Sequence, residues 1–169
     1  MRSIDRIARN SLPLVGALLL AACVSTGPGN LSAGASEADL IARMGKPSGE
    51  LSLADGGRQL EYARGPCGHF TFMVNVGRDG KVRDIQQVLQ ESYFAKVQTG
   101  LTQPEIIALL GHPGRALTYE KINDVVWTYR IEQAGFVEAF LNVHFDLSGK
   151  VTGTSRRTRT SHEGACDYP

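Results

Sequence analysis

Cys67 and His69 come nearest, in this 169-residue chain, to a pair whose residue types could do chemistry. A cysteine thiolate beside an imidazole is a common enzymatic nucleophile. Closeness along the chain does not make such a pair, because catalytic Cys and His residues are usually brought together from distant parts of a sequence. A disulfide bond explains Cys67 better, so we expect no catalysis at this position.

The other histidines also lack the spacing of a catalytic or metal site. His112 directly follows the end of an expected helix, and His162 lies in the C-terminal tail. His144 falls on the outward side of an expected antiparallel strand, where a solvated histidine is the simplest interpretation. The sequence contains neither a phosphate-binding glycine loop nor a metal motif. We therefore expect a protein that is not an enzyme, with no metal site and no cofactor.

Cys23 is the residue with the clearest expected modification. Three arginines within the first nine residues precede the apolar run 12–22, which is too short for a permanent membrane span and has the form of a secretory signal. Residues 20–23, LAAC, end this run and resemble the lipobox of bacterial lipoproteins. A cleaved signal peptide with an incidental cysteine is the alternative.

Lipid on Cys23 would decide where the protein resides. Several acyl chains give stable anchoring, because each buried methylene contributes about 0.8 kcal/mol. Inner-membrane lipoproteins usually carry Asp directly after the lipidated cysteine, and here that position is Val24. We therefore expect a lipid-anchored protein on the periplasmic face of the outer membrane.

Cys67 and Cys166 remain as an even pair once Cys23 carries lipid. The expected compartment is oxidising, which favours a disulfide bond between them. The bond would close a long loop, and chain entropy would then contribute about 4 to 5 kcal/mol. Because the sequence does not fix the distance between the two α-carbons, an unbridged pair stays open as the alternative.

The charge of the chain gives no sign of nucleic-acid binding. The sequence has 18 Lys and Arg against 17 Asp and Glu, and removal of residues 1–22 takes away three Arg and one Asp, which leaves 15 against 16. A nucleic-acid-binding protein usually carries a basic excess. Arg156, Arg157 and Arg159 form a local basic run, which we interpret as a solvated strand end rather than as a contact with lipid headgroups or an acidic partner.

Residues 34–47 and 100–113 are two copies of one short sequence, GASEADLIARMGKP and GLTQPEIIALLGHP. Each copy begins with the form of a capping box and ends at a Gly that is followed two residues later by Pro. The apolar spacing between these signals predicts a two-turn helix in each copy. We expect left-handed backbone at both terminal glycines. The two capping boxes are Ser36 with Asp39 and Thr102 with Glu105.

Strand patterns follow each expected helix. Alternating apolar residues predict three antiparallel strands in each copy, and a further helical turn is expected at residues 92–97. The sequence thus predicts an α+β fold of two tandem ααβββ units, in each of which one or two short helices pack on a three-stranded antiparallel sheet. The expected segments are a signal peptide at 1–22, a lipid-anchored flexible tether at 23–33, a first αβββ repeat at 34–90, a second ααβββ repeat at 91–160 and a tail at 161–169.

Four aromatic residues are candidates for partner binding, namely Tyr62, Trp127, Tyr129 and Phe136. The first three alternate along expected strands as a buried face does, so packing against the repeat helices is the favoured interpretation for them. A partner-binding platform is the alternative, since aromatic anchors supply much of the affinity of protein interfaces. Phe136 lies near an expected loop tip, where it would contact a protein or lipid if exposed and would belong to the core if buried.

The second copy resembles the SmpA/OmlA (BamE-like) family of outer-membrane lipoproteins. The residues that carry the resemblance are Gly100, Leu101, Thr102, Glu105, Ile106, Leu109, Gly111 and Pro113, followed by Trp127, Tyr129 and the turn at Gly149. The lipobox at Cys23 agrees, and the match is best over 91–157 and weaker over 34–90. The resemblance implies an ααβββ fold without catalysis. It also implies an accessory role in the assembly and insertion of β-barrel outer-membrane proteins or in envelope integrity.

The partners implied by this resemblance are the outer-membrane bilayer, reached through acylated Cys23, subunits of the β-barrel assembly machinery, and phosphatidylglycerol. The chain differs from the best-known member of the family, which has one unit, so no binding residue beyond Cys23 is transferred. The tandem arrangement also resembles the β-lactamase inhibitor protein architecture, whose concave sheet grips an enzyme. A periplasmic protein-binding or inhibitor module is therefore the alternative function.

Overall fold

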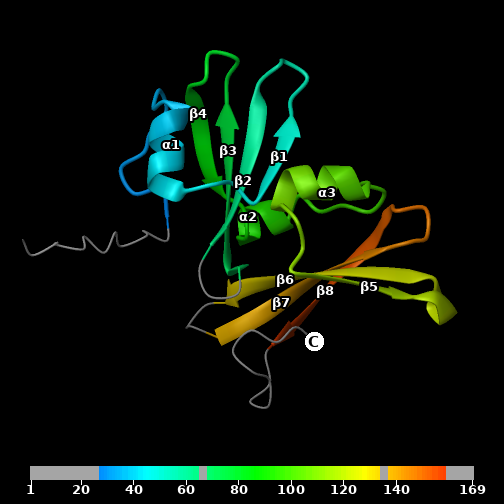
Figure 1. Cartoon of the computed structure of the whole chain (residues 1–169). Helices are drawn as coiled ribbons and strands as arrows, with labels where there is room; N and C mark the ends of the chain where they lie inside the picture. Colours follow the sequence, from blue (N-terminus) through cyan, green and yellow to red (C-terminus); the bar gives the residue numbers. More distant parts are fainter. Residues whose placement is uncertain (1–26, 65–67, 134–136, 159–169) are drawn as a thin grey trace, which may run out of the picture.

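Two antiparallel sheets of four strands each form most of the protein in the computed structural model, which describes residues 27–64, 68–133 and 137–158 (Figure 1). The first sheet consists of β1 (Gly49–Ser52), β2 (Arg58–Arg64), β3 (Phe70–Val76) and β4 (Val82–Gln87). The second consists of β5 (Arg115–Tyr119), β6 (Asp124–Gln133), β7 (Val137–Phe145) and β8 (Val151–Thr158). The helices are α1 (Glu37–Met44), α2 (Glu91–Phe94) and α3 (Gln103–Leu110), with a 3-10 turn at Glu120–Ile122.

The fold is mostly β, and the expectation of ααβββ units on three-stranded sheets is wrong. Each sheet contains a fourth strand, β1 or β5, that directly follows the repeat helix and forms one edge of the sheet. Both strands are short and mostly exposed. They therefore lack the apolar alternation by which a strand is recognised in a sequence. Within the described part of the chain, no helix is long and apolar enough to cross a membrane.

Both predicted capping boxes are present at the starts of α1 and α3. In α1 the Ser36 hydroxyl accepts the N–H of Asp39 at 3.1 Å. In α3 the carboxylate of Glu105 accepts the hydroxyl and the N–H of Thr102, each at 2.7 Å. The hydrogen bond from the Thr102 hydroxyl lowers the pKa of the Glu105 carboxyl most, and the one from the Thr102 N–H lowers it further. The two helices are therefore begun by the same local chemistry.

The glycines that end α1 and α3 do not take the left-handed helical conformation that the sequence predicted. Gly45 has φ 73° and ψ −163°, and Gly111 has φ 84° and ψ −174°. This combination of positive φ and extended ψ is open almost only to glycine. It turns the chain sharply from the helix into the extended segment that leads to β1 or β5, so glycine is required at both places.

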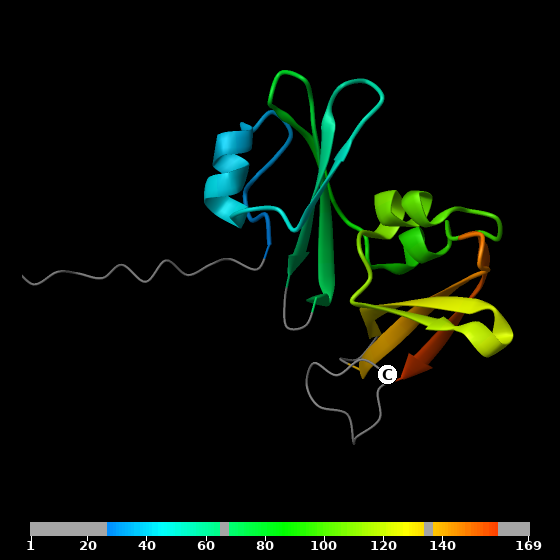
Figure 2. The same cartoon turned by 45° about the vertical axis from the view of Figure 1, so that its right-hand side comes forward.

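The helices and sheets form four layers in the order α1, first sheet, α3, second sheet (Figure 2). Leu40 and Met44 of α1 pack on one face of the first sheet in a core that includes Tyr62. Ile106 and Leu110 of α3 pack on the second sheet. The other members of the second core include Phe94, Trp127, Tyr129, Leu141, Val143 and Phe145. Because α3 lies between the sheets, it is the element that joins the two copies.

In both copies, an isolated β-bridge joins the residue before the helix to the turn before the last strand. Ser36 forms an isolated bridge with Lys81, and Thr102 forms one with Lys150. Such matching pairs show that the copies share their local folding as well as their sequence pattern.

Candidate binding site between the two sheets

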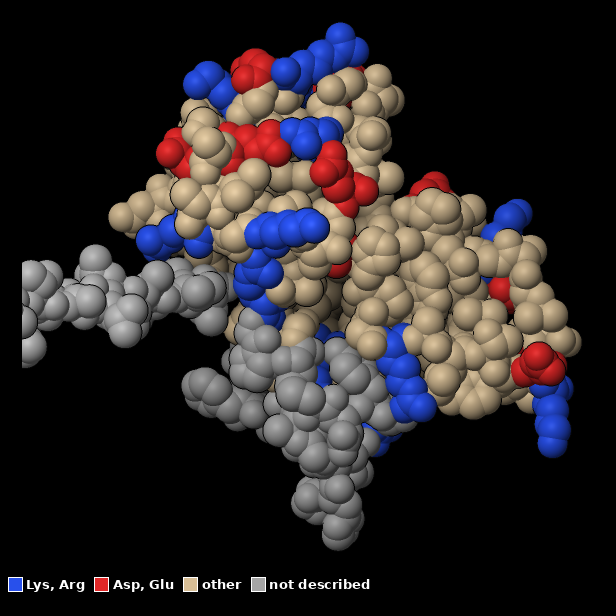
Figure 3. Space-filling model, in the orientation of Figure 1, with Lys and Arg blue, Asp and Glu red and all other residues tan. Residues whose placement is uncertain are grey.

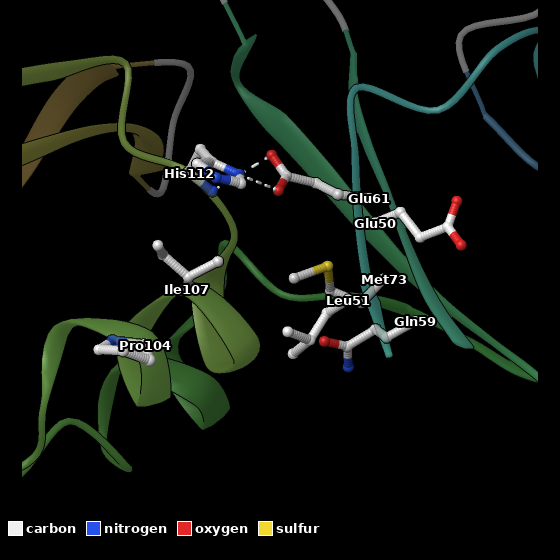
Figure 4. Close-up of a pocket in the computed structure, with 8 residues that line it drawn as sticks. All are labelled: Glu50, Leu51, Gln59, Glu61, Met73, Pro104, Ile107 and His112. Carbon is white, nitrogen blue, oxygen red and sulfur yellow. Dashed lines mark hydrogen bonds and ion pairs between the residues drawn. The ribbon is translucent and has the colours of Figure 1, made fainter. Parts of the chain in front are cut away.

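A pocket of about 220 Å³ lies between α3 and the face of the first sheet that α1 does not cover (Figure 4). We call it the interunit pocket, because both copies of the repeat contribute to it. Its lining residues are Glu50, Leu51, Gln59, Glu61 and Met73 from the first sheet and Pro104, Ile107 and His112 from α3 and the residues after it. The pocket therefore exists only where the two copies meet.

The walls of the interunit pocket are mostly apolar. Leu51 and Met73 face Ile107 and Pro104 across the space, and the carboxylate of Glu50 points away from it (Figure 4). Met73 is buried, whereas Leu51 remains 40% exposed. Leu51 thus lies where the pocket meets solvent. A cavity of this size and lining suits one apolar side chain better than a whole small-molecule ligand, whose pockets usually measure about 300 to 1,000 Å³.

Glu61 and His112 close one end of the interunit pocket. The backbone N–H of His112 donates to one carboxylate oxygen of Glu61 at 3.2 Å, and Nδ1 of the ring donates to the other at 2.6 Å. The Glu61 side chain is only 6% exposed, while that of His112 is 58% exposed. A buried carboxylate needs such partners, because an unpaired one would be costly to desolvate. This pair therefore fixes the end of α3 to the middle of β2.

The same turn is tied to the second sheet by Tyr129. Its hydroxyl donates to the carbonyl oxygen of Gly111 at 3.0 Å. Burial raises the pKa of Tyr129, and the nearby carboxylate of Glu61 raises it further. The hydroxyl therefore stays protonated and remains a donor. Gly111 is bonded to the second sheet and His112 to the first, so these two adjacent residues connect the sheets.

The aromatic candidates for partner binding lie mostly inside the protein. Tyr62, Trp127 and Tyr129 are buried in the two cores, as the packing interpretation favoured. Phe136 lies outside the described residues, so its role as a candidate stays a prediction.

The three cysteines also lie outside the described residues. The lipidation of Cys23 and the disulfide bond between Cys67 and Cys166 therefore stay predictions.

The two described residues of the basic run near the end of β8, Arg156 and Arg157, have partners within the protein, and Arg156 is also exposed, as a solvated strand end would be. Arg156 forms a two-point ion pair with Glu91 of α2, at 2.6 and 2.7 Å. Its guanidinium also lies over the ring of Phe94. The pair holds the pKa of the Glu91 carboxyl below its usual value. Arg157 lies over the ring of Phe140.

His144 lies on the outward face of the sheet, as the sequence predicted, but it also has partners within the protein. It is 28% exposed, and both ring nitrogens have partners. Nδ1 lies 2.9 Å from an oxygen of Asp124, and Nε2 lies 2.8 Å from the hydroxyl of Ser155. These residues come from β6, β7 and β8 and are brought together only by the sheet. Among the described residues, no three His, Cys, Asp or Glu side chains gather as a metal site would require.

Sequence reasoning did not find the interunit pocket. Glu61 stands between Leu60 and Tyr62 and looks like an outward-facing strand residue. It is buried because α3 from the other copy covers that face. The tandem repeat itself was the available signal, since two copies must meet somewhere, but their relative placement depends on tertiary packing.

Comparisons with known proteins do not assign the chain to a family. No protein-family model matches it, and no curated protein matches it. One solved structure is similar in part, a Streptococcus mutans protein provisionally described as a β-lactamase inhibitor protein. It is 13% identical over 79% of this chain and 89% of that chain, with a TM-score of 0.31. A likeness this low carries no argument about function.

Proposed function

We propose that this protein is a lipid-anchored accessory protein on the periplasmic face of the outer membrane, which binds partner proteins during the assembly of β-barrel proteins. The interunit pocket is the observation that carries the proposal. It offers apolar walls, a partly exposed Leu51 at its mouth and a hydrogen-bonded pair of Glu61 and His112 at one end. Such a site takes one apolar anchor side chain from a partner protein.

The edge of the first sheet supports the same proposal. Among the described strands, β1 has a neighbour on one side only, and it borders the interunit pocket through Glu50 and Leu51. An extended segment of a partner can add to such an edge by main-chain hydrogen bonds. The pocket beside β1 would then receive a side chain of that segment.

The distribution of charge also favours binding near α3. On the face shown in Figure 3, charged side chains are denser over α1 and the outer end of the first sheet than over α3 and the second sheet. Protein interfaces are depleted in charged residues at their centres. The lipobox at Cys23 and the resemblance of the second copy to outer-membrane lipoproteins supply the proposed location and the class of partner.

The partner is tested by recovering the full, anchored chain from detergent-solubilised membranes and identifying what accompanies it. We expect subunits of the β-barrel assembly machinery. Leu51→Asp, at the mouth of the pocket, should lower this recovery about 10-fold, which corresponds to the loss of one anchor contact. Ile122→Asp is the matched control, because Ile122 is 70% exposed in the 3-10 turn before β6.

Two results would contradict the proposal. Equal recovery by Leu51→Asp and the unchanged chain would remove the pocket from the binding surface. A soluble periplasmic enzyme as the sole partner would favour the inhibitor function instead.

A further inference from the structure

Asp124, His144 and Ser155 form a continuous hydrogen-bonded relay on the second sheet, on the face opposite α3. The three strands β6, β7 and β8 each supply one residue. Nδ1 of His144 is 2.9 Å from Oδ2 of Asp124, and Nε2 is 2.8 Å from Oγ of Ser155. These are the distances that a nucleophile, a general base and an orienting carboxylate need. The interunit pocket, on the other sheet, does not use any of them.

The order of atoms in the relay sets the protonation of the imidazole. A carboxylate only accepts hydrogen bonds, so Nδ1 of His144 carries the ring proton and donates a hydrogen bond to Asp124. Nε2 then has a free lone pair directed at the hydroxyl of Ser155. The His144 and Asp124 side chains are 28% and 22% exposed, so both are held by the sheet and still reachable from solvent. His144 is therefore placed to take the proton of Ser155.

Asn142 supplies a hydrogen-bond donor beside the hydroxyl. Its Nδ2 lies 3.3 Å from Oγ of Ser155. The hydroxyl of Thr128, a buried residue, donates to Oδ1 of Asn142 at 2.9 Å and so fixes which end of the amide faces Ser155. A fixed N–H donor next to a nucleophile can stabilise negative charge that develops on a substrate oxygen.

The surface beside the relay has room for a substrate. Gly153 pairs with His144 across β7 and β8, and a side-chain carbon added at Gly153 would meet no atom within 4 Å. β8 is an edge strand, so the approach to Ser155 is open on one side among the described strands. Val126, which pairs with His144 on the other side, offers an apolar contact.

The first copy of the repeat does not have this relay. His144 stands directly before an irregularity in the pairing of β7 with β8, and Asn75 stands directly before the matching irregularity between β3 and β4. Asn75 donates to the carboxylate of Asp84 at 3.0 and 3.1 Å. The fold of the repeat therefore requires only a cross-strand polar pair at this position. The combination of Asp, His and Ser is particular to the second sheet.

We propose that Ser155 is the nucleophile of an esterase activity toward small carboxylic esters. Oγ of Ser155 attacks the ester carbonyl carbon while its proton passes to Nε2 of His144, and Asn142 donates to the carbonyl oxygen as it becomes negative. The C–O bond to the leaving alcohol then breaks, and His144 returns the proton to that oxygen. Water, activated by His144, hydrolyses the acyl-Ser155 ester and restores the hydroxyl. This activity departs from the expectation that the chain is not an enzyme.

The test uses the full chain in detergent with p-nitrophenyl acetate and, separately, with diisopropyl fluorophosphate. We expect ester hydrolysis by the unchanged chain. We also expect one phosphoryl adduct on the peptide that contains Ser155. Ser155→Ala and His144→Gln should each lower the rate about 100-fold, the lower range of general-base effects. Ser148→Ala is the matched control, because the Ser148 hydroxyl bonds Asp146 at 2.7 Å, a pair without a histidine.

Three results would overturn the proposal. The first is hydrolysis that survives Ser155→Ala but falls in His144→Gln, which would mean that the imidazole acts alone. The second is an unmodified Ser155 after exposure to the fluorophosphate. The third is a Ser155→Ala variant with an unchanged rate and a lower melting temperature, which would assign the relay to stability.

Asp124→Asn is a further variant for the same rate measurement. It keeps the shape of the site and should slow hydrolysis by disturbing the imidazole tautomer.

Discussion

Cys23→Ser should release the protein from the membrane fraction into the soluble periplasmic fraction. The expected anchor is the set of acyl chains on the Cys23 thiol, and serine cannot be processed in the same way. Membrane affinity rises by about 0.8 kcal/mol per buried methylene, so the loss of whole chains removes essentially all of the binding. Fractionation of cells followed by detection of the chain in each fraction measures the change.

The matched control for Cys23→Ser is Cys166→Ser. It replaces a cysteine near the other end of the chain, where we expect a disulfide bond rather than lipid, and should leave the protein in the membrane fraction. Retention of Cys23→Ser in washed membranes would contradict the lipid anchor. It would also remove the basis for the proposed location.

Gly111→Ala should destabilise the protein more than Gly45→Ala, although the two glycines occupy matching positions. Both have a backbone conformation that costs an alanine about 1–3 kcal/mol. A side-chain carbon at Gly45 would meet nothing within 4 Å, whereas at Gly111 it would lie 2.9 Å from Thr71 and 3.0 Å from the carboxyl carbon of Glu61. The contact at Gly111 forces the first sheet and the end of α3 apart.

The expected difference between these variants is about 1–3 kcal/mol in the free energy of unfolding, the usual cost of overpacking. Urea unfolding followed by circular dichroism measures it for each variant against the unchanged chain. Both variants place an alanine in the same unfavourable backbone conformation, so the difference between them measures the packing at the junction of the two copies. Equal free energies of unfolding for the two variants would contradict the close packing of α3 against β2 and β3.

The helix signals were the part of the fold best predicted from the sequence. The capping boxes at Ser36 and Thr102 depend on residues three apart, and such local chemistry survives in any tertiary setting. The end signals at Gly45 and Gly111 correctly placed a positive φ but gave the wrong ψ. The value of ψ depends on where the chain goes next, which is set by the sheet.

β1 and β5 were missed for a physical reason. Their side chains are mostly exposed, so their residues are not selected for alternating hydrophobicity. The central strands β2, β3, β6 and β7 carry that alternation because at least one face of each is buried, and they were predicted.

The two polar sites could not be predicted because they join residues that are far apart in sequence. Glu61 and His112 are 51 residues apart, and Asp124 and His144 are 20 apart. In the sequence, a catalytic or metal site is recognised by neighbouring Cys and His residues or by the spacing of metal ligands. The residues of the two polar sites show neither pattern. Their formation depends on strand register and on the docking of α3, which are long-range properties. The expectation of no catalysis rests on those patterns and is tested directly at Ser155.

We propose that partner proteins bind at the interunit pocket while the protein is anchored at the outer membrane. A photo-reactive amino acid in place of Leu51, introduced into the lipidated chain in living cells, tests it most directly. We expect a covalent adduct with a subunit of the β-barrel assembly machinery from position 51 and none from the exposed control position 122. An adduct with a soluble periplasmic enzyme alone, or equal labelling from both positions, would contradict it.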